Sequence, residues 1–192
     1  MDALVLSGGR ALRMGGAKPE LEVGGVPLLA RVTAALTSVD TVVVVGPTVP
    51  GARADVVCSE EPPGAGPVAA VAAGMRHVRA PVVLLLGADL PFLTTDAVAA
   101  LLRALGDADR AVAVDDTGRE QPLLSAWRTT ALAAALRRVE PHRGAALRRL
   151  TAEWSVLMGL PGDPPPWWDC DDPDDLARAR AVLTGGGPDG VR

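Results

Sequence analysis

A glycine-rich stretch near the start of the chain carries the first residues suited to chemistry. Between Gly8 and Lys18, in SGGRALRMGGAK, four glycines accompany the cations Arg13 and Lys18. Glycines let backbone N–H groups approach a polyphosphate because no Cβ stands in the way. A guanidinium and an ammonium suit the high negative charge of a nucleoside triphosphate. Lys18 is the only lysine in the chain, and every other basic side chain is an arginine, so this position favours a compact point charge.

The spacing within this stretch excludes two common phosphate-binding patterns. The dinucleotide fingerprint G-x-G-x-x-G is absent, which disfavours a dinucleotide-dependent reductase. The P-loop G-x-x-x-x-G-K-[ST] is absent too, because Ala17 separates Gly16 from Lys18 and Pro19 replaces the hydroxyl residue. An ordinary strand-to-helix turn with solvated cations is the alternative to a triphosphate loop.

Two acidic segments offer carboxylates for a divalent cation. Asp89 follows an apolar run and precedes Leu90–Pro91, so we expect it at the end of a strand. Mg²⁺ prefers one or two carboxylates together with substrate phosphate oxygens, which makes Asp89 the first expected ligand. In DCDDPDD, Asp172 is expected to cap a helix. Asp171 is the candidate second ligand, with a solvated loop acid as the alternative.

Alternating apolar runs and helical patterns must position these residues. Strands are expected at 3–6, 41–46, 81–91, 111–114, 122–127 and 154–158. Helices are expected at 27–36, 68–78, 95–105, 129–139, 143–150 and 173–183. Pro27 and Pro173 are expected in the first turns of their helices, and Thr94 or Thr95 as the cap of the third.

This order of elements predicts a three-layer, Rossmann-like α/β fold. Strands that are apolar on both faces indicate a mostly parallel central sheet covered by helices on both sides. Ligands bind such sheets beyond the carboxyl ends of the strands, where the loops 7–18, 60–67 and 87–91 are expected to meet. The length of 192 residues fits one domain, which we expect at 1–184 with a frayed tail at 185–192.

Composition excludes several function classes. Hydrophobic residues make up 48% of the chain, enough for a sizeable core, and the net charge is −4 with a sequence pI of about 5.2. An acidic chain does not fit a general nucleic-acid binder. No apolar run approaches the roughly 18 residues of a membrane span, and no signal peptide is visible. Cys58 and Cys170 read as reduced thiols, so a cytoplasmic protein is expected.

The motifs together resemble those of a known family. LSGGRALRMGGAK resembles the loop L-A-G-G-x-x-x-R-M-G-x-x-x-K of nucleotidyltransferases related to molybdenum cofactor guanylyltransferase. EEPPGAGPVAAVAAGM resembles the loop that these enzymes place around guanine, and LLLGADLPFLT resembles their D-x-P metal loop. DCDDPDDLARA resembles their ending. The resemblance follows the family order over nearly the whole chain.

The resemblance implies a set of site residues. Backbone groups of Leu6, Ser7 and Gly8 would meet the nucleotide, and Lys18 would contact phosphate. Glu61 would lie near the base or ribose. The other expected nucleotide-binding positions are Gly9, Gly15, Gly46, Gly66 and Pro67. Arg13, Lys18 and Asp89 would carry catalysis through charge stabilisation. Asp89 and Asp171 would hold Mg²⁺.

The activity implied is transfer of GMP from GTP to molybdopterin, with or without bound molybdenum, and with release of pyrophosphate. Transient contact with other cofactor-biosynthesis proteins is implied as well. Two alternatives keep the chemistry and change a substrate: CTP as donor, or another small phosphorylated acceptor. A third is a non-catalytic nucleotide-binding regulator, because the spacing from Met14 to Lys18 is one residue shorter than in the family. Trp167–Trp168 is expected to clasp the sheet, with a lid over a pterin as the alternative.

Overall fold

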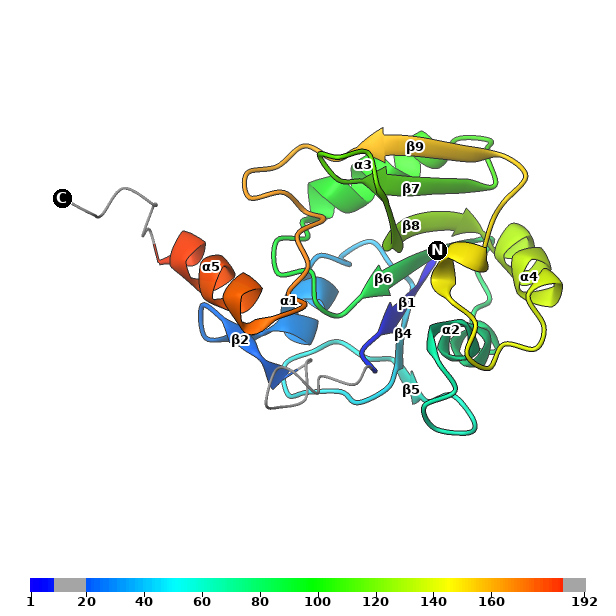
Figure 1. Ribbon diagram of the computed structural model, residues 1–192, viewed down its shortest axis with the longest axis horizontal. Helices are drawn as coiled ribbons and strands as arrows, with labels where there is room; N and C mark the ends of the chain where they lie inside the picture. The colour runs from blue at the N-terminus through cyan, green and yellow to red at the C-terminus, as the bar shows by residue number, and fades with distance from the viewer. Residues whose placement is uncertain (9–19, 185–192) are drawn as a thin grey trace.

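The computed structural model describes residues 1–8 and 20–184. Within those ranges, seven strands form one sheet in the order β5-β4-β1-β6-β8-β7-β9 (Figure 1). Their bounds are β1 Asp2–Leu6, β4 Thr41–Val45, β5 Val56–Cys58, β6 Val82–Gly87, β7 Arg110–Val114, β8 Glu120–Arg128 and β9 Ser155–Gly159. Only β8 runs antiparallel to its neighbours in this sheet, so the predicted mostly parallel α/β fold is confirmed.

Helices cover both faces of the sheet. Their bounds are α1 Leu28–Ala34, α2 Pro67–Met75, α3 Thr95–Leu105, α4 Thr129–Arg138 and α5 Pro173–Leu183. One core lies between the sheet and α1 with α3, and a second core lies between the sheet and α2 with α4. Strand β1 is buried along its whole length, as expected for a strand with a helix layer on each side.

Two predicted helices match the structure because their signals are local. Helix α3 begins at Thr95, and the Thr94 side chain accepts a hydrogen bond from the Ala97 N–H. Helix α5 begins at Pro173, and Asp172 with Asp175 forms a reciprocal capping box. Such caps satisfy N–H groups that have no partner within the helix. Asp172 is therefore structural, as predicted.

The helix predicted over 143–150 is wrong. The structure has only a 3₁₀ turn, η2, at Leu147–Arg149. Gly144 adopts a positive φ of 72°, and its N–H donates to the Ala65 carbonyl at 2.8 Å instead of to a helical partner. Ala146 is extended, which ends any helical continuation. A contact with a distant loop thus overrides the local helical pattern.

Smaller departures surround the first helix. Strand β5 and the short hairpin of β2 (Glu22–Val23) and β3 (Val26–Pro27) were not predicted from the sequence. Because Pro27 pairs with Glu22, it is the residue before α1 and not part of its first turn. The second predicted helix ends at Met75, three residues early.

The tryptophan pair clasps the core, as expected. The Trp168 ring centroid lies 5.4 Å from that of Phe92, in a cluster that also contains Leu176 of α5. Trp167 packs against the core between the sheet and α1 with α3. These contacts anchor the segment that carries the acidic cluster against the sheet.

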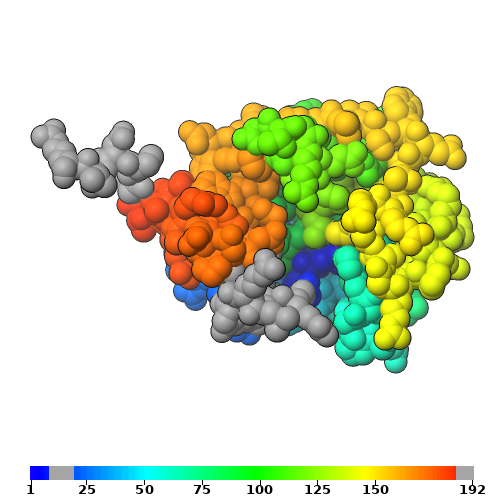
Figure 2. Space-filling model, viewed as in Figure 1, coloured from blue at the N-terminus to red at the C-terminus, as the bar shows by residue number. Residues whose placement is uncertain are grey.

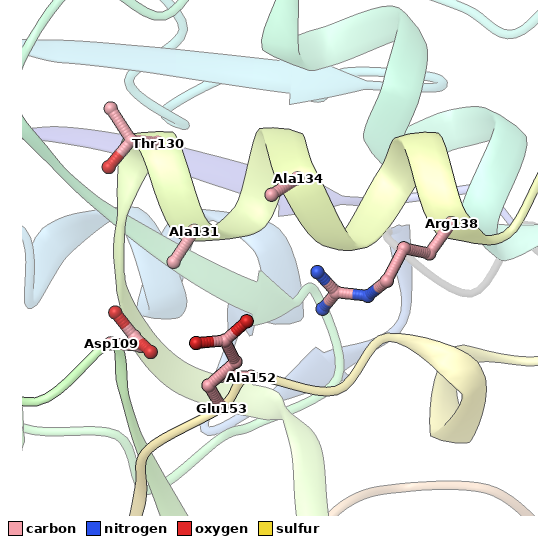
Figure 3. A pocket seen from close by; sticks show the side chains of 7 residues that line it. All are labelled: Asp109, Thr130, Ala131, Ala134, Arg138, Ala152 and Glu153. Carbon is pink, nitrogen blue, oxygen red and sulfur yellow. The ribbon is translucent and has the colours of Figure 1, made fainter.

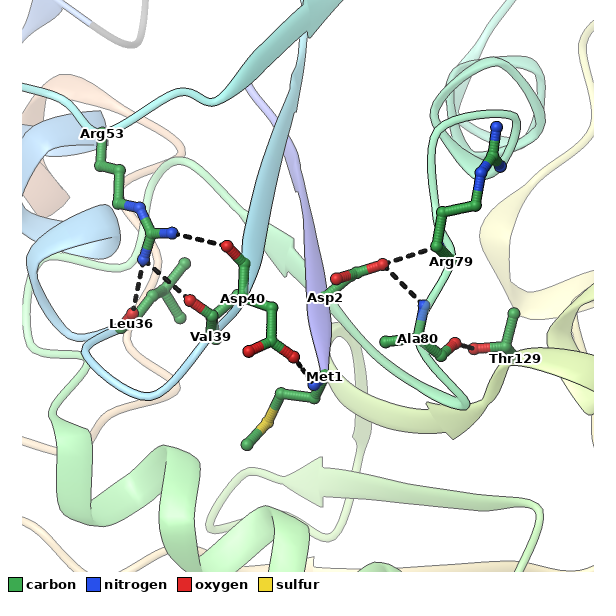
Figure 4. A network of polar contacts seen from close by, with 9 residues as sticks. All are labelled: Met1, Asp2, Leu36, Val39, Asp40, Arg53, Arg79, Ala80 and Thr129. Atoms are coloured by element: carbon green, nitrogen blue, oxygen red, sulfur yellow. Dashed lines mark hydrogen bonds and ion pairs between the residues drawn. The ribbon is translucent and has the colours of Figure 1, made fainter.

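Polar contacts fasten the amino ends of the central strands (Figure 4). The buried Asp2 carboxylate accepts hydrogen bonds from the N–H groups of Arg79 and Ala80, at 2.7 and 2.9 Å. The Arg53 guanidinium donates to the carbonyls of Val39 and Asp40, both at 2.9 Å. This end of the sheet is therefore held together by hydrogen bonds, at the side opposite the carboxyl ends of the parallel strands.

Among the described residues, no helix is long and apolar enough to span a bilayer.

Candidate functional site

The carboxyl ends of β1 and β4 meet through backbone contacts. Ser7 is buried, with 4% of its surface exposed. Its N–H donates to the Val45 carbonyl at 3.0 Å, and its hydroxyl donates to the Pro47 carbonyl at 2.6 Å. The Gly8 N–H also reaches the Val45 carbonyl, at 3.3 Å. The start of the glycine-rich stretch is thus fixed against the end of the neighbouring strand.

Gly46 makes this close approach of the two strands possible. Its φ is +118°, a conformation that favours glycine, and a Cβ here would lie 2.6 Å from Gly8 N and 2.8 Å from Ser7 Oγ. The Gly46 N–H donates to the Cys58 carbonyl at 2.8 Å, which ties β5 to the same edge. The resemblance gave Gly46 as a nucleotide contact, and the structure places it directly beside Ser7 and Gly8.

Asp89 lies just beyond the end of β6, beside the same edge. The Ala88 N–H donates to the Leu6 carbonyl at 3.0 Å, so the chain entering Asp89 is held next to the end of β1. The Asp89 carboxylate folds back over Gly87, where an added Cβ would overlap its Oδ1 atom. Asp89 is half-buried. Asp89 therefore lies at the carboxyl end of β6, next to the end of β1.

The C-terminal acidic cluster reaches Asp89 through the main chain. The Cys170 N–H donates to the Asp89 carbonyl at 3.1 Å, and the Cys170 side chain is fully buried beneath α5. Asp169 and Asp171 flank that contact on either side. The structure thus brings the two predicted metal-ligand segments together, although about 80 positions of sequence separate them. Within residues 1–8 and 20–184, no group of three or more His, Cys, Asp or Glu side chains is arranged to hold a metal by itself.

The loop between β5 and α2 lies on the other side of β1. Glu61 is exposed, and the neighbouring Glu60 carboxylate accepts a hydrogen bond from the Gly64 N–H at 2.9 Å. Gly66, with a φ of +103°, precedes α2, and Pro67 opens the helix. The first N–H groups of a helix and its dipole favour electronegative ligand atoms. The Gly144–Ala65 hydrogen bond attaches the 140–145 segment to this loop.

These segments surround a hollow in the molecular surface (Figure 2). The deep-blue start of the chain is visible at its floor. One wall, in teal and yellow, is formed by the segment after α4 and by the loop between β5 and α2, residues 60–67, which we call the base loop. The orange segment that leads into α5 forms the opposite wall, and the green β7–β8 connection overhangs the top. The hollow therefore opens at the carboxyl ends of β1 and β6, where ligands bind in this class of fold.

The start of β8 also belongs to this edge, which the sequence pattern did not predict. Because β8 is antiparallel, its first residues lie beside the carboxyl ends of the parallel strands. The Leu123 Cβ lies 3.5 Å from the position that a Cβ on Gly87 would occupy. The pairing of β7 with β8 shifts between Val112 and Ala113, which makes a bulge at this point. Pro122, which cannot donate a backbone hydrogen bond, was the available signal for that irregularity.

The described thiols and histidines do not form a nucleophilic site. Burial raises the pKa of the Cys58 thiol, and Arg76 only partly offsets this shift, so the thiol is a poor nucleophile near neutral pH. Cys170 is buried in the core. His142 Nε2 lies 3.2 Å from the Leu136 carbonyl, which is a structural contact.

A separate cavity of about 230 Å³ lies along α4, at the opposite end of the strands (Figure 3). It is lined by Asp109, Thr130, Ala131, Ala134, Arg138, Ala152 and Glu153. The carboxylates of Asp109 and Glu153 would repel the phosphates of a nucleotide. This cavity is therefore not a second candidate for a triphosphate site.

Four predicted site residues lie outside the described residues: Gly9, Arg13, Gly15 and Lys18. The remaining predicted positions all belong to segments around the hollow. Leu6, Ser7, Gly8 and Gly46 lie at the carboxyl ends of β1 and β4. Glu61, Gly66 and Pro67 belong to the loop between β5 and α2 and the start of α2, Asp89 follows β6, and Asp171 precedes α5.

Comparison with known proteins gives a consistent result. The model of the MobA-like NTP transferase domain matches residues 3–156. The chain is 32% identical over 201 aligned positions to a probable molybdenum cofactor guanylyltransferase of Chloroflexus aggregans, covering 100% of this chain and 92% of that protein. It is 36% identical to the molybdenum cofactor guanylyltransferase of Rhodopseudomonas palustris, covering 94% of this chain and 91% of that protein.

Solved structures share the fold. The molybdopterin-guanine dinucleotide biosynthesis protein A of Archaeoglobus fulgidus has a TM-score of 0.73 at 21% identity, covering 96% of this chain and all of that one. The 2-C-methyl-D-erythritol 4-phosphate cytidylyltransferase of Thermus thermophilus has a TM-score of 0.70 at 21% identity, covering 95% and 98% of the two chains. The sequence matches extend across both walls of the hollow. The chain thus belongs to the family of MobA-like NTP transferase domains.

Proposed function

We propose that this protein is a molybdenum cofactor guanylyltransferase. It transfers GMP from GTP to the terminal phosphate of molybdopterin, with or without bound molybdenum, and releases pyrophosphate. The observation that carries the proposal is the convergence of three motif segments at one sheet edge: Ser7–Gly8 with Gly46, the base loop, and Asp89. Relatives named for this activity match the chain over nearly its full length.

The nucleotide half of the site lies over β1 and β4. Ser7 and Gly8 supply backbone at the start of the glycine-rich stretch, and Gly46 lets that backbone approach the end of β4 because it has no side chain. The loop from Pro62 to Pro67 borders this half and suits a base. We propose Arg13 and Lys18 as the cations that contact the triphosphate, since phosphates need charge-assisted hydrogen bonds.

A divalent cation fits the donor set on the acidic side. The Asp89 carboxylate lies at the strand end, and the backbone bond from Cys170 to Asp89 brings Asp169 and Asp171 close to it. One or two carboxylates combined with phosphate oxygens are the usual ligands of Mg²⁺, so we propose Asp89 and Asp171 as the protein's ligands. When bound, the ion would supply charge neutralisation at the α-phosphate and the departing pyrophosphate.

The chain's own contribution is positioning and electrostatic stabilisation. The acceptor phosphate attacks the α-phosphorus in line with the leaving pyrophosphate, so donor and acceptor must lie on opposite sides of the reacting centre. Asp89 follows β6, which lies between β1 on the nucleotide side and β8 on the other side. No covalent enzyme intermediate is needed, which agrees with the unreactive surroundings of Cys58.

We further propose that residues 1–184 form one nucleotidyltransferase domain, with molybdopterin and GTP as its substrates and cofactor-biosynthesis proteins as transient partners. The shared fold with a cytidylyltransferase keeps CTP as the rival donor. A regulator of the same fold without turnover is the rival of a different class.

Pyrophosphate release tests these options directly. The purified chain is incubated with Mg²⁺ and GTP, CTP or ATP, with and without molybdopterin. We expect release only with GTP and molybdopterin together, and a larger rise of the melting temperature with GTP than with ATP. A site that hydrogen-bonds guanine leaves buried groups unpaired with adenine. Release with CTP alone among the nucleotides would identify a cytidylyltransferase, and binding without release would identify a regulator.

A further inference from the structure

The β7–β8 connection holds the amide of Gln121, at the start of β8, beside the edge at which the parallel strands end. Gln121 Nε2 donates to Asp115 Oδ2 at 3.0 Å. A carboxylate only accepts hydrogen bonds, so chemistry assigns the nitrogen of the amide to the side facing Asp115. Gln121 is half-buried, and its Oε1 atom has no hydrogen-bond partner among the described residues. The amide therefore presents a carbonyl oxygen, and the second proton of its nitrogen, to other groups.

Asp115 is itself held by the turn that precedes Gln121. Its Oδ1 atom accepts hydrogen bonds from the Thr117 N–H, the Thr117 hydroxyl and the Arg119 N–H, at 2.9, 2.6 and 3.0 Å. The Thr117 hydroxyl is the main cause of a lowered pKa for Asp115, and the backbone and Gln121 donors act in the same direction. Asp115 is thus an ionised anchor at neutral pH. The free end of Gln121 is oriented directly by this carboxylate, through its Oδ2 atom.

Sheet topology places Gln121 on the side of Asp89 opposite the nucleotide half. The strand order is β4-β1-β6-β8, with Ser7 and Gly46 at the ends of β1 and β4 and Asp89 after β6. Leu123 of β8 lies beside Gly87 of β6. Two residues beyond Leu123 the chain reaches Gln121, and two residues beyond Gly87 it reaches Asp89. Neighbouring strands are about 4.8 Å apart, so the β8 edge is within the length of a small ligand from Asp89.

We propose that Gln121 is a specificity-determining residue for the acceptor, and that it recognises a heterocycle with adjacent hydrogen-bond donor and acceptor atoms, such as the pyrimidinone edge of a pterin. The assignment rests on the proposed function for the identity of the acceptor. Asp115 is a positioning residue in this arrangement, because it acts on the ligand only through Gln121. The base loop occupies the other half of the edge, so Gln121 acts on the acceptor and not on GTP.

Binding of molybdopterin, followed by calorimetry in the presence of Mg²⁺ and a non-hydrolysable GTP analogue, tests the assignment without relying on turnover. Gln121→Met keeps the length of the side chain and removes the amide. We expect the acceptor Kd to rise about tenfold, the usual effect of losing one or two neutral hydrogen bonds. The Kd for the GTP analogue should stay within about twofold of wild type, because the substitution removes no hydrogen bond to GTP.

Two further variants separate recognition from hairpin stability. Thr117→Val removes one bond to Asp115 but leaves Gln121 in place, and should bind the acceptor like wild type. Gln121→Glu places a carboxylate beside that of Asp115, so this variant should bind molybdopterin poorly. Adding Asp115→Asn to Gln121→Glu restores a donor to the pair and should recover part of the affinity. Folding of each variant is checked by circular dichroism.

The possible results are distinct. A wild-type acceptor Kd in Gln121→Met, or an equal loss of acceptor and GTP-analogue binding, would show that Gln121 is not an acceptor residue. Absence of rescue in the double variant would overturn the anchoring role of Asp115. If the unaltered protein binds the GTP analogue but not molybdopterin, the proposed acceptor is wrong and the pterin assignment of Gln121 is wrong with it. If it binds both and releases no pyrophosphate, the proposed activity fails while the Gln121 assignment is still decided by the Kd values.

Discussion

Substitution of Gly46 by alanine is expected to damage the nucleotide half of the site more than it damages the fold. The residue has a φ of +118°, and the new Cβ would lie 2.6 Å from Gly8 N and 2.8 Å from Ser7 Oγ. The first of these atoms belongs to the backbone at the start of the glycine-rich stretch. It cannot rotate away as the end of a flexible side chain would.

The magnitude follows from the geometry. Ordinary contact for a Cβ begins at 3.4 Å, so the Gly8 backbone must move by about 0.8 Å to admit the methyl group. The unfavourable φ costs about 1–3 kcal/mol of the free energy of unfolding. Overpacking adds a further cost of about 1–3 kcal/mol. A displacement near 1 Å at a positioning element lowers kcat/KM by up to about 10²-fold, so we expect a loss of that order for GTP.

Gly51→Ala is the matched control. Gly51 also has a positive φ, +82°, but an added Cβ there meets nothing within 4 Å. Urea denaturation should show a loss of stability in both variants, larger for Gly46→Ala. Calorimetry with GTP and Mg²⁺ should show weakened binding only for Gly46→Ala. Equal GTP affinity in the two variants would refute the idea that the Gly46 contact positions the nucleotide segment.

Two other substitutions test the charged groups. Asp89→Asn should lower turnover by about 10²–10³-fold, because it removes a well-placed electrostatic group. It should also weaken the dependence of turnover on Mg²⁺, while the circular dichroism spectrum stays unchanged. Turnover and an Mg²⁺ titration like those of wild type would contradict the assignment of Asp89 as a metal ligand. Lys18→Arg should lose most kcat/KM for GTP, with Lys18→Ala at least as impaired and Arg13→Lys milder, because a planar guanidinium is bulkier than an ammonium and we expect the loop to be one residue shorter than the family pattern that it resembles. Full activity of Lys18→Arg would show that charge alone matters there.

The parts of the fold that could be predicted from sequence are those whose signals are local. Apolar runs predicted β1, β4 and β6, and their burial on both faces follows from the helix layers. Thr94 and Asp172 predicted the starts of α3 and α5, because a cap acts on N–H groups two or three residues away. The general position of the site could also be predicted, because the carboxyl ends of parallel strands lie along one edge of the sheet.

The errors arise where distant segments decide the local conformation. The sequence around Gly144 has a helical pattern, but its N–H bonds to Ala65 and the chain turns there instead. The start of β8 reads as an ordinary strand after a turn. Only the antiparallel pairing with β6 places Leu123 beside Gly87, at the edge of the site. No spacing within either segment encodes these contacts.

The contacts that assemble the site are mostly between main-chain atoms. Ser7 bonds to Val45, Ala88 to Leu6, and Cys170 to Asp89, and each joins segments at least 38 residues apart. A backbone hydrogen bond requires no particular side chain, so the sequence can indicate which carboxylates and glycines suit the chemistry without showing that they meet. What the sequence does record is the absence of a side chain where a backbone approaches, as at Gly46, or where another side chain fills the space, as at Gly87. Glycines at strand ends are therefore the residues through which this site can be altered without touching a charged group.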